Sequence, residues 1–180
     1  VQQVVSHQSQ GNGFVATVHS KMFDKKDKEV MSADLEYKCS NGTMTVDMRN
    51  FINEEQMKAF GNYEMQVDAE NLEIPGNLKV GQTLKDGTLN ITAVNSPIPI
   101  TMSVTITDRK VVAKEAITTP AGTFDCFKIT STSTVKSKMG IGMTVAVDNV
   151  EWLAPKVAVV KSESYRNGKM QGYTLLTSWK

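Results

Sequence analysis

Histidine and cysteine are scarce in this chain, which has only two of each among its 180 residues. These are the residues most often found in metal sites and at nucleophilic centres. Neither His7 nor His19 has a cysteine or an acidic cluster near it at the spacing of metal ligands. We therefore expect no metal site and no metal cofactor.

The sequence motifs of common catalytic sites are also missing. The chain has no G-x-S-x-G turn, no H-E-x-x-H helix, no phosphate-binding loop and no G-x-G-x-x-G turn. Glu115 and Asp125 flank a turn, but nothing nearby in the sequence supplies the desolvation that tunes a general acid. We predict that the protein is not an enzyme and uses no cofactor.

Charge and apolar patterning exclude two further classes of interaction. The formal net charge is only +1, and most basic residues are isolated lysines, so no concentrated field would attract a nucleic-acid backbone. No apolar run approaches the roughly 20 residues that a membrane-spanning helix requires. We expect no nucleic-acid partner and no membrane-spanning segment.

The two cysteines, Cys39 and Cys126, lie too far apart in the sequence for a CxxC redox pair. Three alternatives stay open: a disulfide, two buried thiols or two free thiols. In an oxidising compartment a disulfide between them would close a long loop and stabilise the fold by roughly 4 kcal/mol.

The length and composition fit one domain, because two domains within 180 residues would each be small and poorly buried. Residues 1–12 are polar and show no sustained period, which predicts a flexible N-terminal lead or a short edge strand. Residues 13–180 are predicted to form a single β domain. The chain starts at Val1 without an apolar leader, so we expect that a signal peptide has been removed.

Apolar and polar side chains alternate through most of the chain, which is the period-2 pattern of half-buried strands. Asn41-Gly42 and Asn167-Gly168 each stand between two such stretches, and this dipeptide favours the type I′ turn of a β-hairpin. One short helix is predicted over residues 53–60, with Asn53 as its N-cap. At residues 148–149 the alternation changes phase, which predicts a β-bulge or a tight bend.

About ten strands and one short helix follow from this pattern, with the strands linked mainly by turns. The predicted fold class is therefore all-β and mainly antiparallel. We expect a strongly curved sheet that forms a roll or a barrel-like domain.

Ten methionines are many for a chain of this length. Core packing is the default interpretation, but flexible methionine side chains also line adaptable apolar binding surfaces. An apolar ligand inside the curved sheet would contact inward-facing methionines and a large aromatic ring. The candidate lining residues are Met44, Met48, Met102, Met143 and Trp152.

Three segments together resemble the TapB-like family, a domain of unknown function found in exported proteins of Bacteroidales-type bacteria. The first is L-x-I-P-x-x-L-x-V-G-x-x-L-x-D-G, from Leu72 to Gly87. The second is T-P-A-G-T-F-D-C-F-K-I, from Thr119 to Ile129, and the third is E-W-L-A-P-x-V-A-V-V-K-S-E, from Glu151 to Glu163. The resemblance implies export to the periplasm or the outer cell surface and a curved β-sheet like that of periplasmic lipoprotein carriers.

Composition, side-chain pattern and family resemblance together indicate a binding protein of the cell envelope. We expect an exported cell-envelope protein that acts as a non-catalytic binding or carrier module for an apolar small molecule or lipid. The alternative is a structural or interaction module that meets an envelope protein through exposed strand edges or aromatic patches.

Overall fold

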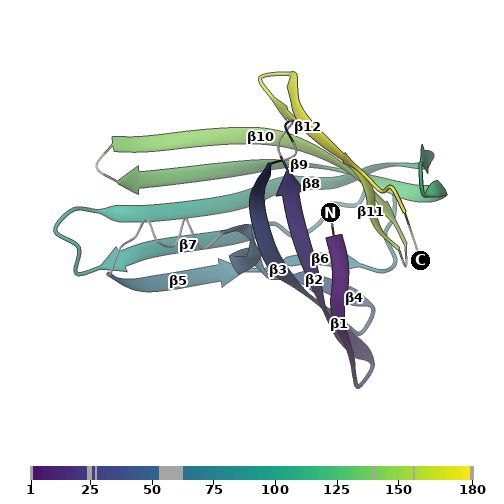
Figure 1. Cartoon of the computed structure of the whole chain (residues 1–180), viewed down its shortest axis with the longest axis horizontal. Coiled ribbons are helices and arrows are strands. Elements are labelled where there is room, and N and C mark those ends of the chain that lie inside the picture. The colour runs from purple at the N-terminus through teal and green to yellow at the C-terminus, as the bar shows by residue number, and fades with distance from the viewer. Residues whose placement is uncertain are drawn as a thin grey trace.

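Two antiparallel β-sheets that cross one another make up the fold (Figure 1). The computed structural model describes residues 2–23, 26, 28–52, 63–139, 141–155 and 157–178. The predicted all-β, mainly antiparallel fold class is confirmed, with the strands divided between two sheets. Among the helices of the described part of the chain, none is long and apolar enough to cross a membrane.

Sheet A has five strands and comes mainly from the first quarter of the chain. The first strand of the chain is one of the two edge strands of this sheet, and it is fully exposed. It lies within residues 1–12, for which a flexible lead or a short edge strand was predicted. In spatial order the strands are β1 (Gln2–Gln10), β2 (Gly13–Phe23), β3 (Glu29–Ser40), β4 (Thr43–Val46) and β6 (Leu72–Pro75).

Sheet B has seven strands and forms the platform that runs across Figure 1. Two long strands at its centre form one hairpin, and the remaining strands extend the sheet on both sides. In spatial order they are β12 (Lys169–Leu175), β11 (Ala158–Arg166), β10 (Ile141–Ala154), β9 (Gly122–Met139), β8 (Ile100–Thr119), β7 (Gly87–Val94) and β5 (Glu64–Glu70).

Both hairpins predicted from Asn-Gly pairs are confirmed. Asn41 and Gly42 connect β3 to β4 with φ values of 49° and 75°, and Asn167 and Gly168 connect β11 to β12 with φ values of 51° and 73°. A type I′ turn requires positive φ at both central residues, which asparagine and glycine tolerate best. These four residues therefore fix where the chain reverses.

The two sheets are continuous at one corner. β5 of sheet B and β6 of sheet A are separated only by Asn71, so the chain passes directly from one sheet to the other. The Asn71 side chain accepts a hydrogen bond of 3.1 Å from the backbone N–H of Met48, in a 3-10 helix over Met48–Phe51. The Met48 side chain is fully buried, so this corner is part of the core.

Three clusters of buried side chains cover different areas of sheet B. We call its inner face the one that packs against Met48 and Leu72, because the largest cluster lies there. A second inner-face cluster joins Leu153 of β10 to the loop between β6 and β7. The third cluster lies on the opposite, outer face and contains Trp152 and Cys126.

The β-bulge or tight bend predicted at residues 148–149 is wrong. β10 pairs with β9 without a register shift from Ile141 to Leu153. Val147 and Val150 face opposite sides of one regular strand, and Val150 packs against the outer-face cluster. The alternation of apolar residues in the sequence changed phase because β10 buries side chains on both faces near its end. Val150 packs on the outer face, whereas Leu153 is buried on the inner face. The helix predicted over residues 53–60 lies outside the described residues.

Candidate functional site

The five residues predicted to line an apolar site do not share one surface. Met48 and Met102 belong to the inner-face core, and Met44 is half-buried on sheet A. Met143 shares the inner face with Met102 by register, but 59% of its surface is exposed. Trp152 points to the outer face, since it neighbours the inward Leu153 on the same regular strand.

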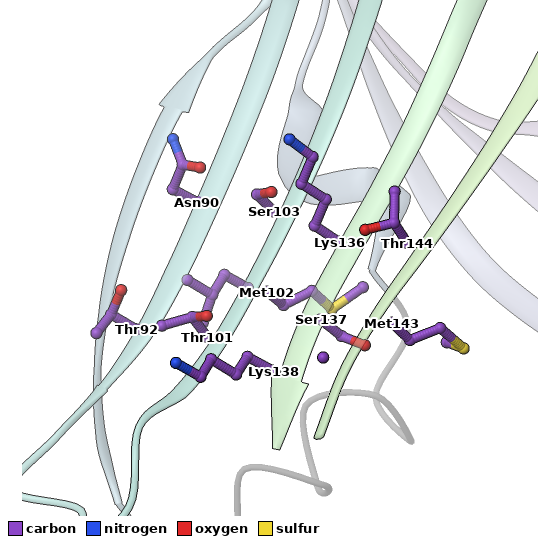
Figure 2. Close-up of a pocket in the computed structure, with 12 residues that line it drawn as sticks. Asn90, Thr92, Thr101, Met102, Ser103, Lys136, Ser137, Lys138, Met143 and Thr144 are labelled. Atoms are coloured by element: carbon purple, nitrogen blue, oxygen red, sulfur yellow. The ribbon is translucent and has the colours of Figure 1, made fainter. Parts of the chain in front are cut away.

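A hollow of about 660 Å³, which we call the polar hollow, lies on sheet B where β7, β8, β9 and β10 run side by side (Figure 2). Figure 2 shows Lys136 and Lys138 pointing away from the side on which Met102 and Met143 lie. The side chains of Met102 and Met143 therefore lie on the inner face of sheet B, opposite the face on which the two lysines point. Its lining is Asn90, Ile91, Thr92, Thr101, Met102, Ser103, Lys136, Ser137, Lys138, Gly142, Met143 and Thr144.

A second hollow, which we call the hairpin hollow, lies where the end of β8 approaches the β11–β12 hairpin. It is shallow, has a volume of about 460 Å³, and exposes mainly apolar atoms. Met170 and Tyr173 are 51% and 68% exposed, so both offer unburied apolar surface to this hollow. Its lining is Ala116, Ile117, Thr118, Lys161, Glu163, Met170, Tyr173 and Leu175.

Trp152 anchors a polar network beside the hairpin hollow. Its indole ring lies beneath two ammonium groups, with Nζ of Lys161 at 4.4 Å and Nζ of Lys128 at 5.0 Å from the ring centre. The indole Nε1–H donates a 2.6 Å hydrogen bond to Glu115, and this bond together with the nearby Lys128 lowers the pKa of that carboxyl. The carboxylate is thereby held ionised next to the ring.

The same network continues along β11 into the hairpin hollow. Lys161 Nζ forms a 2.7 Å ion pair with Glu163, and the Tyr165 hydroxyl donates a 2.6 Å hydrogen bond to the same carboxylate. Both contacts lower the pKa of Glu163. The two charged groups of this hollow, Lys161 and Glu163, are therefore already paired, which leaves its mainly apolar surface open to a ligand.

The two cysteines are free thiols in the structure, and no disulfide joins them. Cys39 lies half-buried in sheet A, whereas Cys126 lies fully buried in the outer-face cluster of sheet B. A disulfide requires Cα atoms closer than about 7 Å, and the two positions belong to different sheets. Burial raises the pKa of the Cys126 thiol, so it behaves as a packing group.

A buried charged group between the two sheets was not found from the sequence. Arg109 is only 4% exposed, and its guanidinium donates hydrogen bonds to the backbone carbonyls of Glu73, at 3.1 Å, and Lys85. Burial lowers the pKa of Arg109, and the neighbouring charges of Glu151, Asp86 and Glu73 oppose that shift.

Glu151 points to the inner face of β10, where desolvation raises the pKa of its carboxyl against the attraction of Arg109. Tyr37 of sheet A is close enough for the Glu151 charge to add to the burial that raises the tyrosine pKa. One signal in the sequence could have revealed Glu151: it has the same parity as the inward Val147 and Leu153.

Within the described ranges, no group of three or more histidine, cysteine or acidic side chains is placed to hold a metal ion. Glu115 and Asp125, the acidic pair that flanks a turn in the sequence, have different neighbours in the structure. Glu115 pairs with Cys126 across the β8–β9 hairpin and bonds Trp152, whereas Asp125 lies opposite Ala116.

Two solved structures share this two-sheet fold. One is a protein from Bacteroides fragilis assigned as exported and as having a YmcC-like fold, with 22% identity and a TM-score of 0.70. The other is a protein from Parabacteroides distasonis assigned as a lipoprotein, with 23% identity and a TM-score of 0.73. Each match covers 99% of this chain and 86% of the other chain.

The profile of the DUF3108-like family matches residues 1–176, so the chain belongs to the DUF3108-like family. A comparison with curated proteins finds no match. The more specific TapB-like resemblance stays a prediction.

The partly buried Glu151 gives a stability prediction with a defined pH dependence. Because its pKa is raised on folding, the folded protein binds this proton more tightly than the unfolded chain. That stabilisation is complete below the ordinary carboxyl pKa and is lost as the pH rises through the raised value. Glu151→Gln should therefore leave the free energy of unfolding unchanged near about pH 4 and increase it near about pH 8.

Urea unfolding at both pH values measures this difference. Glu70→Gln is the matched control, because Glu70 is exposed at the edge of sheet B. A loss of stability for Glu151→Gln at the higher pH would contradict the prediction, since it would mean that attraction by Arg109 outweighs desolvation.

Proposed function

We propose that the protein is an exported cell-envelope module that binds an apolar small molecule or lipid chain in the hairpin hollow, without catalysis. One observation carries the proposal: the hollow exposes mainly apolar atoms, and its polar groups Lys161 and Glu163 are already paired with each other. A ligand with hydrogen-bonding groups would have to compete with that pair, whereas an apolar chain would not.

The location of the hollow also supports binding. Its floor lies beside the outer-face cluster, where Trp152 and Cys126 are buried and fixed by neighbouring strands. Its rim, with Met170 and Tyr173, belongs to the edge strand β12. A floor of packed side chains and an exposed rim allow an apolar ligand to bury side chains that water now surrounds.

Export is supported by the likeness to proteins that are themselves assigned as exported or as a lipoprotein. An interaction with an envelope protein through the same exposed rim is the second candidate function. The exposure of Met170 and Tyr173 on an edge strand is the observation that favours it.

The binding proposal is tested with the fluorescent probe 11-(dansylamino)undecanoic acid, which has an apolar chain. We expect saturable binding that Met170→Ser and Tyr173→Ser each weaken by about fivefold. Each substitution removes apolar contact worth roughly 1 kcal/mol, given that these side chains are already partly covered. Fluorescence titration measures the dissociation constants.

Ile98→Ser is the matched control for this titration, because Ile98 is 50% exposed in the loop between β7 and β8 and does not line the hairpin hollow. Its dissociation constant should equal that of the unmodified protein. Absence of saturable binding, or an equal loss in Ile98→Ser, would rule out the hairpin hollow as the apolar site.

The export proposal has a separate test. The full-length protein, produced from its own gene in its own host, is followed by immunoblotting of cell fractions. We expect it in the envelope fractions, together with a periplasmic or surface marker. Recovery with a cytoplasmic marker would contradict export and leave the binding result unaffected.

A further inference from the structure

The polar hollow differs from the hairpin hollow in the state of its charges. Lys136 and Lys138 are exposed on β9, and neither forms an ion pair in the part of the chain that the structure describes. Lys128 and Lys161, on the same face near Trp152, both have carboxylate partners. Two unpaired ammonium groups two residues apart on one strand are therefore a distinctive feature of this hollow.

The register of sheet B arranges polar side chains around these lysines in two rows. In the first row Lys136 lies opposite Ser103 on one side and Thr144 on the other. Ser103 in turn lies opposite Asn90, and Asn90 lies opposite Asp68 of the edge strand β5.

The second row runs parallel to the first, two residues further along each strand. Lys138 lies opposite Thr101 and Gly142, and Thr101 lies opposite Thr92. Neighbouring strands are about 4.8 Å apart, and side chains on one face of a strand repeat roughly every 6.4 to 6.8 Å. Hydrogen-bonding side chains are therefore arrayed in two dimensions over this part of the sheet, so a ligand with several hydroxyl groups could contact more than one of them.

The space above these rows is open. Gly142 has no side chain, and the nearest described atom to a Cβ built there would be the carbonyl oxygen of Ser137, at 3.9 Å. Figure 2 shows Thr92, Thr101 and Lys138 near one another on the β7–β9 part of the hollow. The hollow therefore combines cationic groups on β9 with neutral hydroxyl and amide groups on β7 and β8.

We propose that the polar hollow is a second binding site, specific for an anionic saccharide, that is, a sugar bearing a phosphate or a carboxylate. Lys136 and Lys138 bind the anionic group, and Asn90, Thr92, Thr101 and Ser103 bind the hydroxyl groups. The proposal rests on these residues alone and is independent of ligand binding in the hairpin hollow.

The charges on the same face orient the ligand. Asp68 stands at the end of the first row, three strands away from Lys136. Its carboxylate repels an anion at the β5 edge, so the anionic group lies over β9 and the neutral part of the sugar lies over β7 and β8. Among the described residues, two cations line this hollow, which favours a small anionic ligand over a polyanion.

The test is a titration of isotope-labelled protein, followed through its backbone amide signals. The probes are glucose 1-phosphate, glucuronic acid, neutral glucose and inorganic phosphate. We expect at least one of the two anionic sugars to bind saturably and to shift the signals of Thr101, Ser103, Lys136 and Lys138. Glucose and inorganic phosphate should each bind about tenfold more weakly, because each lacks one of the two kinds of contact. Which anionic sugar binds identifies the anion as phosphate or carboxylate.

Two double variants make the test specific. Lys136→Gln with Lys138→Gln should weaken binding about tenfold. Lys110→Gln with Lys169→Gln, at exposed lysines outside the hollow, should leave it unchanged. The amide spectrum of each variant also reports whether it is folded. The proposal is overturned if neither anionic sugar binds, if glucose or inorganic phosphate binds as tightly as the tighter-binding anionic sugar, or if the Lys136 and Lys138 variant binds as the unmodified protein does.

Discussion

The buried guanidinium of Arg109 links the two sheets, and the rest of the architecture depends on that link. It lies in β8 of sheet B and donates hydrogen bonds to the carbonyl of Glu73, in β6 of sheet A, and to that of Lys85 in the following loop. A buried cation is costly unless it is fully bonded, so these acceptors hold their positions closely. Backbone hydrogen bonds reinforce the link, because Leu84 N–H donates to the Arg109 carbonyl.

Because sheet A is held against one side of sheet B, the two faces of sheet B differ in what covers them. The inner face is occupied by Met48, Leu72 and the loop residues Leu78 and Leu84, and these side chains supply the core. Within the described residues, the outer face has its buried cluster around Trp152. Its remaining surface carries the two hollows, which lie toward opposite ends of β8 and differ in chemistry, one apolar and one cationic with many hydroxyl groups.

Local patterns in the sequence predicted the strands and turns well. The Asn41-Gly42 and Asn167-Gly168 turns were found because their backbone conformation is a property of the dipeptide itself. The period-2 alternation likewise identified the fold class. Neither signal says which face of a strand will be covered at a given point, since that depends on which other strands fold over it.

The candidate site shows this limit most clearly. Trp152 and Leu153 are adjacent and both buried, yet they belong to clusters on opposite faces of sheet B. The inward parity of Met102 and Met143 was interpreted correctly, but Met143 is exposed. Arg109 could not be found from local pattern, because its acceptors are carbonyls of residues more than twenty positions away.

The most direct test of this account is the free energy of unfolding of Arg109→Met, measured by urea denaturation beside Arg49→Met. Arg49 is exposed and pairs with the neighbouring Asp47, so its loss should cost less than about 1 kcal/mol. Loss of Arg109 removes the donor to the Glu73 and Lys85 carbonyls and leaves Glu151 without its cationic neighbour, and should cost at least about 3 kcal/mol. Equal effects of the two substitutions, or a more stable Arg109→Met protein, would contradict the claim that this arginine holds the sheets together.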